Sequence, residues 1–254
     1  MNPENASFDR LGLDDNLLGV IRDKQFTQPT DIQAQTLPHA LKGRDILGCA
    51  QTGTGKTAAF ALPIIQRLYR ENFKRGWRPI RSLIVAPTRE LAAQIGEEFR
   101  EFGTHCGLRH TVIFGGVNQR PQCKNLRRGV DILIATPGRL LDLINQGEVD
   151  LDRVEILVLD EADRMLDMGF LPDIKRIVKL VPDKRQTMLF SATMPPAIDQ
   201  ISASLLHNPF SVTIAPEAPA ADTVDQAVHF VENNAKLPLL TDLLACSSIP
   251  RPLS

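Results

Sequence analysis

Residues 50–57 read Ala50-Gln51-Thr52-Gly53-Thr54-Gly55-Lys56-Thr57, the most informative segment of the chain. An apolar run ends just before it at Cys49, and a helical pattern follows it from Ala58. Glycines at this spacing let a loop wrap an anion with no Cβ atom in the way, and the first turn of the next helix adds backbone N–H donors. The order of strand, glycine loop and helix therefore predicts a nucleotide-binding phosphate loop.

Each position of this loop has an expected role. The backbone N–H groups of Gly53, Gly55 and Lys56 would cradle phosphates, and the Lys56 side chain would reach the β- and γ-phosphates. The Thr57 hydroxyl would bind Mg²⁺. The usual pattern opens with glycine, whereas Ala50 stands there in this sequence, and the plain alternative is a glycine turn that caps a helix.

The rest of the chain alternates short apolar runs with helical patterns. Helical spacing of apolar residues marks 90–102 and 172–180. The apolar runs are continuous, which is typical of strands buried on both faces. They cover residues 45–50, 82–86, 110–114, 131–135, 155–159, 186–190 and 210–214. We therefore predict an α/β domain with a mostly parallel central sheet flanked by helices, in which ligands bind beyond the carboxyl ends of the strands.

A cluster of carboxylates follows the apolar run at 155–159. Charged residues after a strand often mark only the return of the chain to solvent. Together with a phosphate loop upstream, however, Asp160 is a candidate Mg²⁺ ligand, directly or through water. Glu161 would then orient and deprotonate the water that attacks the γ-phosphate. The predicted reaction class is hydrolysis of a nucleoside triphosphate.

The letters Asp160-Glu161-Ala162-Asp163, taken with the phosphate loop, resemble the DEAD-box ATP-dependent RNA helicases. Further stretches are similar to that family's motifs in the same order. They are Phe26–Gln33 (Q motif), Gln51–Thr57 (motif I), Pro87–Leu91 (motif Ia), Gly115-Gly116 (the double glycine), Thr136–Arg139 (motif Ib) and Ser191–Thr193 (motif III). One departure is Gln25, where the family usually has glycine.

The resemblance implies a RecA-like P-loop NTPase domain that uses ATP and Mg²⁺. It makes Lys56, Asp160 and Glu161 catalytic, with Thr57 and Asp160 at the metal. The implied nucleotide-binding residues are Phe26, stacked on adenine, Gln33, reading its edge, and Gln51, Thr52, Gly53, Thr54, Gly55, Lys56 and Thr57. The implied coupling residues are Asp163, Ser191 and Thr193. Sequence-independent contacts to single-stranded or locally duplex RNA would come from Pro87, Thr88, Arg89, Gly115, Gly116, Thr136, Pro137, Gly138 and Arg139. Taken alone, Gly-Gly and Thr-Pro-Gly are also plain turn sequences.

The expected domain organisation follows from the same resemblance. Residues 1–215 would form the first RecA-like domain, 216–225 a linker rich in Pro and Ala, and 226–254 the start of a second helicase domain with a strand at 226–231 and a helix near 236–245. The rest of that second domain, with the arginines that reach the γ-phosphate, is the implied partner, so we expect the chain alone to be nearly inactive. The alternatives are a module that binds RNA or a protein without useful catalysis, and a DNA translocase on the same fold.

Composition and charge bear on nucleic-acid binding, on the cell compartment and on membrane segments. A net charge of -1 gives no global field for nucleic acid, so RNA binding would need a local site. The scattered cysteines, the polar first residues and the lack of a long apolar run predict a cytoplasmic protein without a membrane segment. The basic run at 67–81, with Tyr69 and Trp77, is interpreted as a solvated connector rather than an RNA patch. Met165, Met168 and Phe170 are interpreted as core packing.

Overall fold

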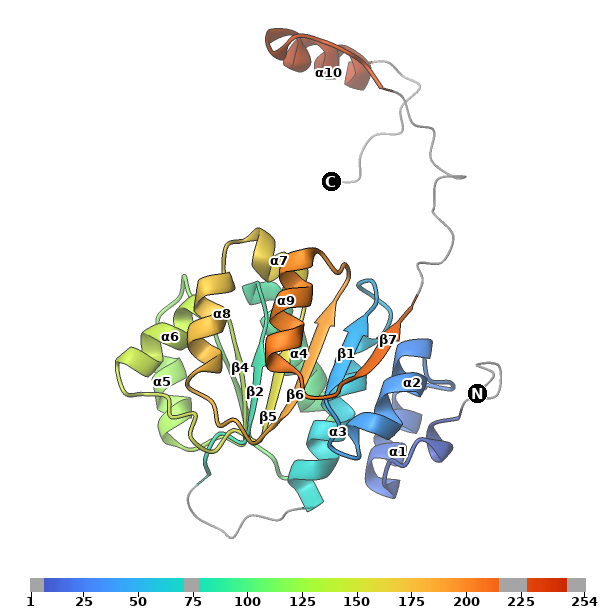
Figure 1. The fold of residues 1–254 in the computed structure, drawn as a ribbon, viewed down its shortest axis with the longest axis vertical. Coiled ribbons are helices and arrows are strands. Elements are labelled where there is room, and N and C mark those ends of the chain that lie inside the picture. The colour runs from blue at the N-terminus through green and yellow to red at the C-terminus, as the bar shows by residue number, and fades with distance from the viewer. Residues whose placement is uncertain (1–6, 71–77, 215–227, 246–254) are drawn as a thin grey trace. The chain divides into compact units, whose positions relative to one another are not determined.

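The computed structural model describes residues 7–70, 78–214 and 228–245. The chain divides into two compact units, residues 1–216 and 217–254. The elements of the first unit are η2 (Phe8–Arg10), α1 (Asp15–Asp23), α2 (Asp31–Ala40), β1 (Ile46–Cys49), α3 (Lys56–Arg70), β2 (Ser82–Val85), α4 (Arg89–Phe102), β3 (His110–Ile113), α5 (Arg120–Arg127), β4 (Ile132–Ala135), α6 (Pro137–Asn145), β5 (Ile156–Leu159), α7 (Ala162–Asp167), α8 (Leu171–Val178), β6 (Gln186–Ser191), α9 (Pro196–Leu205) and β7 (Phe210–Thr213) (Figure 1).

One sheet of seven strands runs through the first unit in the order β3-β4-β2-β5-β6-β1-β7. Every neighbouring pair is parallel. The seven apolar runs of the sequence all form strands, so the prediction of an α/β domain with a parallel sheet is confirmed. Parallel neighbours need a crossover, and the helices between successive strands supply it.

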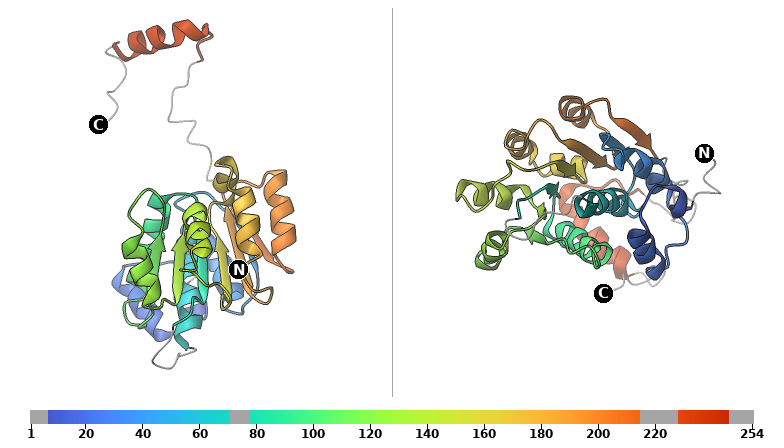
Figure 2. Two further views of the ribbon diagram at one scale, coloured as in Figure 1. Left: turned by 90° about the vertical axis from the view of Figure 1, so that its left-hand side faces the viewer. Right: turned by 90° about the horizontal axis from the view of Figure 1, so that it is seen from below.

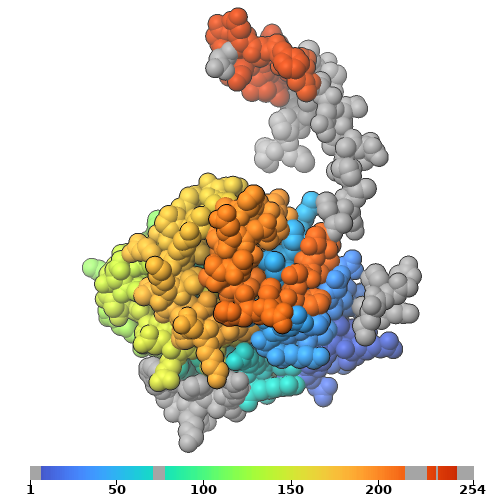
Figure 3. All heavy atoms as spheres, in the orientation of Figure 1, coloured from blue at the N-terminus to red at the C-terminus, as the bar shows by residue number. Residues whose placement is uncertain are grey.

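Helices cover both faces of the sheet, and each face has its own core. Along β4, Ile132 and Ile134 pack with α1–α4 on one face, whereas Leu133 and Ala135 pack with α5–α9 on the other. Figure 2 shows the sheet between these two helical layers, and Figure 3 shows α8 and α9 on the surface of the second layer. The alternation arises because successive side chains of a strand point to opposite faces.

Continuous burial holds for the inner strands β2, β4, β5 and β6, whose residues are all buried. The prediction is wrong for the inner strand β1 and for the edge strands β3 and β7, in which only some of the residues are buried. An edge strand has a neighbour on one side only, so its helical cover is incomplete and part of its side-chain surface meets water.

The parallel sheet gathers the candidate site at one edge. The carboxyl ends of β1, β2, β3, β4, β5 and β6 lead directly into residues 50–57, 86–89, 114–119, 136–139, 160–163 and 191–193. Segments far apart in the sequence therefore share the end of the sheet where ligands of this architecture bind.

Helix α1 ends in a left-handed residue at the point where the sequence departs from the family pattern. Gln25 has φ 59°, and the next N–H, that of Phe26, donates to Ile21 O at 3.1 Å. This is a Schellman-type ending, in which glycine is the usual residue because a Cβ atom strains the left-handed region. Gln25 thus adopts the left-handed conformation that glycine would have at this position, and its backbone is strained as a result.

The substitution Gln25→Gly is expected to raise the free energy of unfolding by about 1 kcal/mol, because it removes that strain. Urea denaturation followed by circular dichroism measures the change. The matched control is Gln94→Gly, at an exposed position inside α4, which is expected to lower stability by about 1 kcal/mol. A loss of stability in Gln25→Gly would contradict the prediction.

The second unit contains η4 (Asn233–Ala235) and α10 (Lys236–Ala245) among its described residues. The predicted helix is therefore confirmed at 236–245. The predicted strand at 226–231 is wrong for residues 228–231, which have no strand pairing, while Gln226 and Ala227 lie outside the described residues. A single strand with no neighbour leaves its ladder groups unpaired. Across the described ranges no helix combines the length and apolarity needed to cross a bilayer.

Candidate functional site

The phosphate loop lies between β1 and α3, as the sequence predicts. Gly53 and Gly55 have φ 87° and 89°, a conformation that L side chains rarely adopt. Gln51, Thr52 and Gly53 are exposed, so a ligand can reach the backbone of the loop. The buried Lys56 donates from Nζ to Ala50 O at 2.9 Å, which folds its ammonium back over the loop. A phosphate bound in the loop would offer this ammonium a charged acceptor in place of a neutral carbonyl.

Gln33 joins helix α2 to the phosphate loop. Its Nε2 donates to Gly55 O at 3.1 Å, and its Oε1 accepts from the Thr30 N–H at 3.1 Å. Thr30 and Gln33 form a capping box at the start of α2. The glutamine that the family resemblance assigns to adenine is therefore also a strut that holds the loop in place.

Exchanging the two loop glycines for alanine should have unequal effects. A Cβ at Gly55 would lie 2.4 Å from Gln33 Nε2 and 3.0 Å from Thr30 Oγ1, whereas a Cβ at Gly53 meets nothing within 4 Å. Gly53→Ala then carries only the strain of a positive φ, about 1–2 kcal/mol. Gly55→Ala also displaces Gln33 from its hydrogen bonds, which adds about 1–3 kcal/mol. Thermal and urea unfolding measure both variants, and equal stabilities would contradict the role of Gln33 as a strut.

Phe26 lies at the start of the same motif and is 38% exposed. Its ring meets Phe102 edge to face, with centroids 6.3 Å apart, and Lys24 Nζ lies 5.7 Å from its centroid. An exposed aromatic ring supported from behind can stack on a planar base. The geometry is thus compatible with the adenine contact that the family resemblance implies.

Asp160 stands directly after β5 and is 2% exposed. Burial raises its pKa to about 6, although the nearby Lys56 ammonium opposes the rise. Its Oδ1 accepts the Glu161 N–H at 3.0 Å. A buried carboxylate with a raised pKa is a ready ligand for a hard cation, whose charge would offset the cost of ionisation. Among the described residues no three His, Cys, Asp or Glu side chains cluster as a metal site.

Glu161 connects the acidic motif to the phosphate loop. Thr52 Oγ1 donates to its Oε1 at 3.3 Å, and Arg164 Nη1 donates to its Oε2 at 3.2 Å. The backbone of Glu161 has φ 51°, a left-handed conformation that costs about 1–2 kcal/mol for a residue other than glycine. Such strain is common at functional sites, and here the turn aims a buried carboxylate at the loop.

Asp163 joins the acidic motif to the end of β6. Its Oδ2 accepts from the Thr193 hydroxyl at 2.8 Å and from the Thr193 N–H at 2.9 Å, and its own N–H donates to Ser191 Oγ at 3.1 Å. Burial alone would raise the pKa of Asp163, but hydrogen bonds from the side chains of Thr193 and Ser191 and from the N–H groups of Ala192 and Thr193 outweigh it and lower the pKa. The structure therefore brings the three predicted coupling residues into direct contact.

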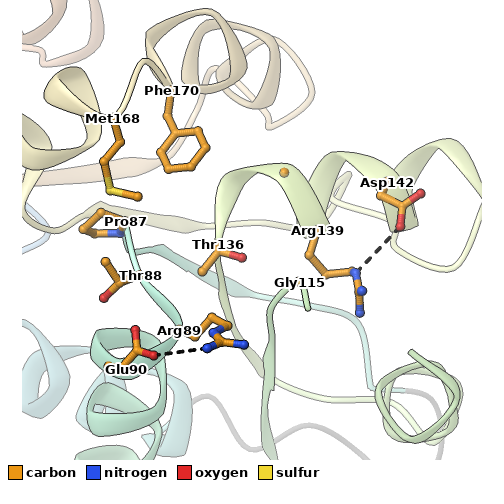
Figure 4. Close-up of a pocket in the computed structure, with 11 residues that line it drawn as sticks. Pro87, Thr88, Arg89, Glu90, Gly115, Thr136, Arg139, Asp142, Met168 and Phe170 are labelled. Carbon is orange, nitrogen blue, oxygen red and sulfur yellow. Dashed lines mark ion pairs between the residues drawn. The ribbon is translucent and has the colours of Figure 1, made fainter. Parts of the chain in front are cut away.

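The predicted RNA-binding residues gather in a groove of about 550 Å³ beside this site (Figure 4). It is lined by Pro87, Thr88, Arg89, Gly115, Thr136, Gly138 and Arg139, together with Glu90, Asp142, Met168 and Phe170. Of the two other predicted residues, Gly116 faces Arg89, whose Nη1 lies 3.0 Å from where a Cβ would stand, and Pro137 is buried in the first turn of α6. Three separate loops therefore form one surface.

The groove offers donors for an anionic backbone. Helices α4 and α6 both begin there, with Thr88 and Thr136 as their N-caps, and the first backbone N–H groups of a helix have no partner within the helix. Arg89 lies 3.6 Å from Glu90, and Arg139 lies 3.7 Å from Asp142, as the dashed lines in Figure 4 mark. Arg139 Nη1 is buried and has no hydrogen-bond partner within the described residues. A phosphate would satisfy such a donor.

The interpretation as core packing is wrong for Met168, whereas Phe170 is partly buried and packs against the core of the second helical layer as predicted. Met168 is 47% exposed, and both side chains line the groove, whereas Met165 is 1% exposed and belongs to the core as predicted. The helix α7 ends at Asp167, so the next residues leave the helical register in which an apolar side chain would face the sheet. Asp142 was also missed, although its position three residues after Arg139 on a helix favours an ion pair.

The interpretation of the basic run at 67–81 as a solvated connector is wrong for Arg81, which is 2% exposed, and residues 71–77 lie outside the described residues. In the described part, Arg67 and Arg81 both pair with Glu155, and Arg78 pairs with Asp131 at 2.5 Å. Arg78 and Arg81 precede β2, at the end of the sheet opposite the groove, and Arg67 lies in the last turn of α3. Their ion pairs involve Asp131 and Glu155, the residues just before β4 and β5.

Comparison with known proteins agrees with this geometry. Among curated proteins, the chain is 46% identical over 237 residues to the ATP-dependent RNA helicase CshA of Limosilactobacillus reuteri, covering 93% of this chain and 47% of that protein. It is also 46% identical over 237 residues to the ATP-dependent RNA helicase DBP2 of Lodderomyces elongisporus, covering 92% and 43%. The chain thus spans less than half the length of these relatives.

A solved structure and a family model extend the match. The crystal structure of a DEAD box protein from the hyperthermophile Methanococcus jannaschii is 36% identical with a TM-score of 0.76, covering 94% of this chain and 63% of that one. The fold is therefore RecA-like, as expected. The family model described as DEAD/DEAH box helicase matches residues 30–201, which include the phosphate loop, Asp160–Asp163 and the groove. With most of its length matched by that model, this chain belongs to the DEAD/DEAH box helicase family.

Proposed function

We propose that this chain is the ATP-binding part of an ATP-dependent RNA helicase, in which hydrolysis is coupled to local unwinding of an RNA duplex. The observation that carries the proposal is a chain of contacts from the phosphate loop toward the end of β6. Thr52 bonds Glu161, and two residues further on Asp163 bonds Thr193. A change in the nucleotide therefore has a short physical route to neighbouring strand ends.

The loop would bind the phosphates of ATP through its backbone N–H groups. Lys56 would exchange its bond to Ala50 O for one to the β- and γ-phosphates. Thr57 and Asp160 would hold Mg²⁺, which when bound neutralises charge on the phosphate oxygens. Phe26 would stack on the adenine, and Gln33, which has one amide hydrogen beyond its bond to Gly55, would read the edge of the base.

Glu161 would act as the base in hydrolysis. Its carboxylate, held by Thr52 and Arg164, would accept a proton from the water that attacks the γ-phosphorus. The bond between the γ-phosphorus and the bridging oxygen breaks, leaving ADP and phosphate. Fixed anchors on both carboxylate oxygens favour this role because they limit the reorganisation needed at the moment of proton transfer.

The groove would bind RNA by its sugar-phosphate backbone. Two helix N-termini, Arg89 and Arg139 supply donors that do not depend on base identity. The exposed Met168 and the neighbouring Phe170 add an apolar wall against which a sugar or base can pack. Phosphate would replace Glu90 and Asp142 as the partner of the two arginines.

Catalysis would require a second RecA-like domain, of which residues 226–254 would be the start and 216–225 the linker. In related phosphoryl transfers, an arginine supplied from across the site is worth about 10³–10⁵ in rate. The chain alone would then bind ATP weakly and hydrolyse it very slowly. We place the intact protein in the cytoplasm, since its scattered cysteines suit a reducing compartment.

Steady-state ATPase activity, with and without single-stranded RNA, tests the proposal. It is measured for the chain alone and after addition of a separately expressed second domain from a close relative. We expect RNA-dependent turnover only in the mixture, at a rate at least about 10³-fold above that of the chain alone. Competition between single-stranded RNA and DNA of equal length distinguishes an RNA helicase from a DNA translocase.

Two outcomes would contradict the proposal. RNA-stimulated turnover by the chain alone would show that it does not need a second domain. ATP binding with no turnover even after the second domain is added would favour a module that binds RNA or a partner without useful catalysis. Binding of a fluorescent adenine nucleotide, measured in parallel, shows whether inactivity arises at binding or at hydrolysis.

A further inference from the structure

A second groove, strongly basic, lies along helix α5. It has a volume of about 460 Å³ and is lined by Gln119, Arg120, Cys123, Lys124, Arg127, Arg128 and Glu148. Four cations face a single carboxylate, which leaves a net charge of +3 in a chain whose total is -1. None of the motifs that identify the family lies in this groove.

The charge of the groove is largely uncompensated. Arg127 is paired with Glu148, through Nε to Oε2 at 2.9 Å and through a second contact. Arg120, Lys124 and Arg128 are exposed, and their side chains have no ion-pair partner in the part of the chain that the structure describes. No Asp or Glu occurs in the sequence between Glu101 and Asp131, so no carboxylate of their own segment screens them. A concentration of unpaired cations of this kind attracts a polyanion.

The basic groove continues from the groove at the strand ends. Gly115 lines the first groove and Gln119 lines the second, and four residues of chain can span at most about 14 Å. Two contacts hold this connection in place: Arg139 Nη2 donates to Val117 O at 3.2 Å, and Gln119 Nε2 donates to Gln146 Oε1 at 3.0 Å. Figure 1 and the left panel of Figure 2 show α5 and α6 side by side, so the basic helix borders the helix whose N-terminus opens the first groove.

We propose that the α5 groove binds the phosphate backbone of the RNA segment that extends beyond the first groove. This rests on the proposed function, because it assumes that RNA occupies the first groove. Helix α5 has eight residues, so its cations extend over about 12 Å, and it begins five residues after Gly115. Arg120, Lys124 and Arg128 contact successive phosphates without reading sequence, while Arg127 stays with Glu148 and stiffens the groove.

The experiment measures RNA binding by the full chain at low ionic strength, using fluorescence anisotropy with oligouridylates of about 6 and about 20 nucleotides. The test variant replaces Arg120, Lys124 and Arg128 by Gln. The matched control replaces Lys42, Arg153 and Lys184 by Gln, which removes the same charge from exposed positions just before the amino ends of β1, β5 and β6. Circular dichroism and thermal unfolding confirm that both variants are folded.

We expect the test variant to bind the long RNA about tenfold more weakly and to bind the short RNA within about twofold of the parent chain. The slope of log K against log salt for the long RNA should fall in magnitude by about 2, because three single-strand contacts are lost. The control variant should match the parent within about twofold on both RNAs.

Two results would overturn the inference: an unchanged affinity of the test variant for the long RNA, or an equal loss in the control variant. Arg89→Gln separates this failure from failure of the proposed function. That variant should weaken binding of the short RNA, and if it does not, the first groove is not the primary RNA site. Loss of long-RNA binding in the α5 variant alone would then still support a basic RNA site on α5.

Discussion

Replacing Glu161 by Gln should lower the rate of RNA-stimulated ATP hydrolysis by about 10²–10⁴-fold, the usual contribution of a general base. Glutamine has nearly the same shape and can keep bonds to Thr52 and Arg164 only in part, but it cannot accept the proton of the attacking water. The assay is steady-state turnover by the chain mixed with a second domain. Affinity for a fluorescent adenine nucleotide should remain within about fivefold, because Glu161 does not contact the phosphates in the proposed arrangement.

The control for this change is Glu97→Gln, an isosteric substitution at an exposed position of α4. Its side chain pairs with Arg100 on the surface and is remote from the phosphate loop, so turnover should be unchanged. Thermal unfolding of Glu161→Gln is measured as well, to show that the variant is folded. The left-handed backbone at residue 161 is equally strained with Glu or Gln, so the unfolding temperature should change little. Turnover of Glu161→Gln above half that of the parent would show that Glu161 is not the general base.

Asp160→Asn should raise the free energy of unfolding of the nucleotide-free chain by about 2–3 kcal/mol at pH 7.5. The pKa of Asp160 is raised to about 6 by burial, and each unit above its usual value of 3.8 corresponds to about 1.4 kcal/mol for ionising the folded state. Asparagine resembles the protonated acid and avoids this cost. The same variant should lose Mg²⁺-dependent hydrolysis, since the carboxylate is the proposed cation ligand.

The pH dependence gives the sign of this effect. A carboxyl group whose folded pKa is raised contributes its stability below the unfolded pKa and loses it as the pH rises through the folded value. The parent and the variant should therefore be equally stable below about pH 4, diverge between pH 4 and 6, and differ by a constant amount above that range. Urea unfolding across this range measures the difference.

The control for Asp160→Asn is Asp167→Asn, at an exposed position at the end of α7, which should change stability by no more than about 0.5 kcal/mol. A destabilised Asp160→Asn at pH 7.5 would contradict the prediction and would mean that the charge of Lys56 dominates over burial. Mg²⁺ with a nucleotide should stabilise the parent but not the variant, which separates the metal role from the effect of burial.

Local patterns predicted most of the first unit because each depends on near neighbours in the chain. A run such as 132–135 is apolar on both sides of the strand, so its burial between two layers follows from composition alone. The phosphate loop likewise needs only glycines of the right spacing between a strand and a helix. The strand predicted at 226–231 failed for residues 228–231, because a strand exists only through a partner that the local pattern does not specify.

The candidate site, too, was predicted in part from the sequence and in part became visible only in the structure. Residue types and motif order predicted a nucleotide loop and an acidic catalytic pair, and the family resemblance added three short segments suited to an RNA backbone. Only the tertiary structure showed that Gln33 supports Gly55, that Asp163 bonds Thr193, and that Met168 is exposed in the groove. These contacts join residues whose separation along the chain carries no information about their distance in space. The parallel sheet supplies that information, because it brings the carboxyl ends of its strands to one edge, where motifs distant in sequence become neighbours.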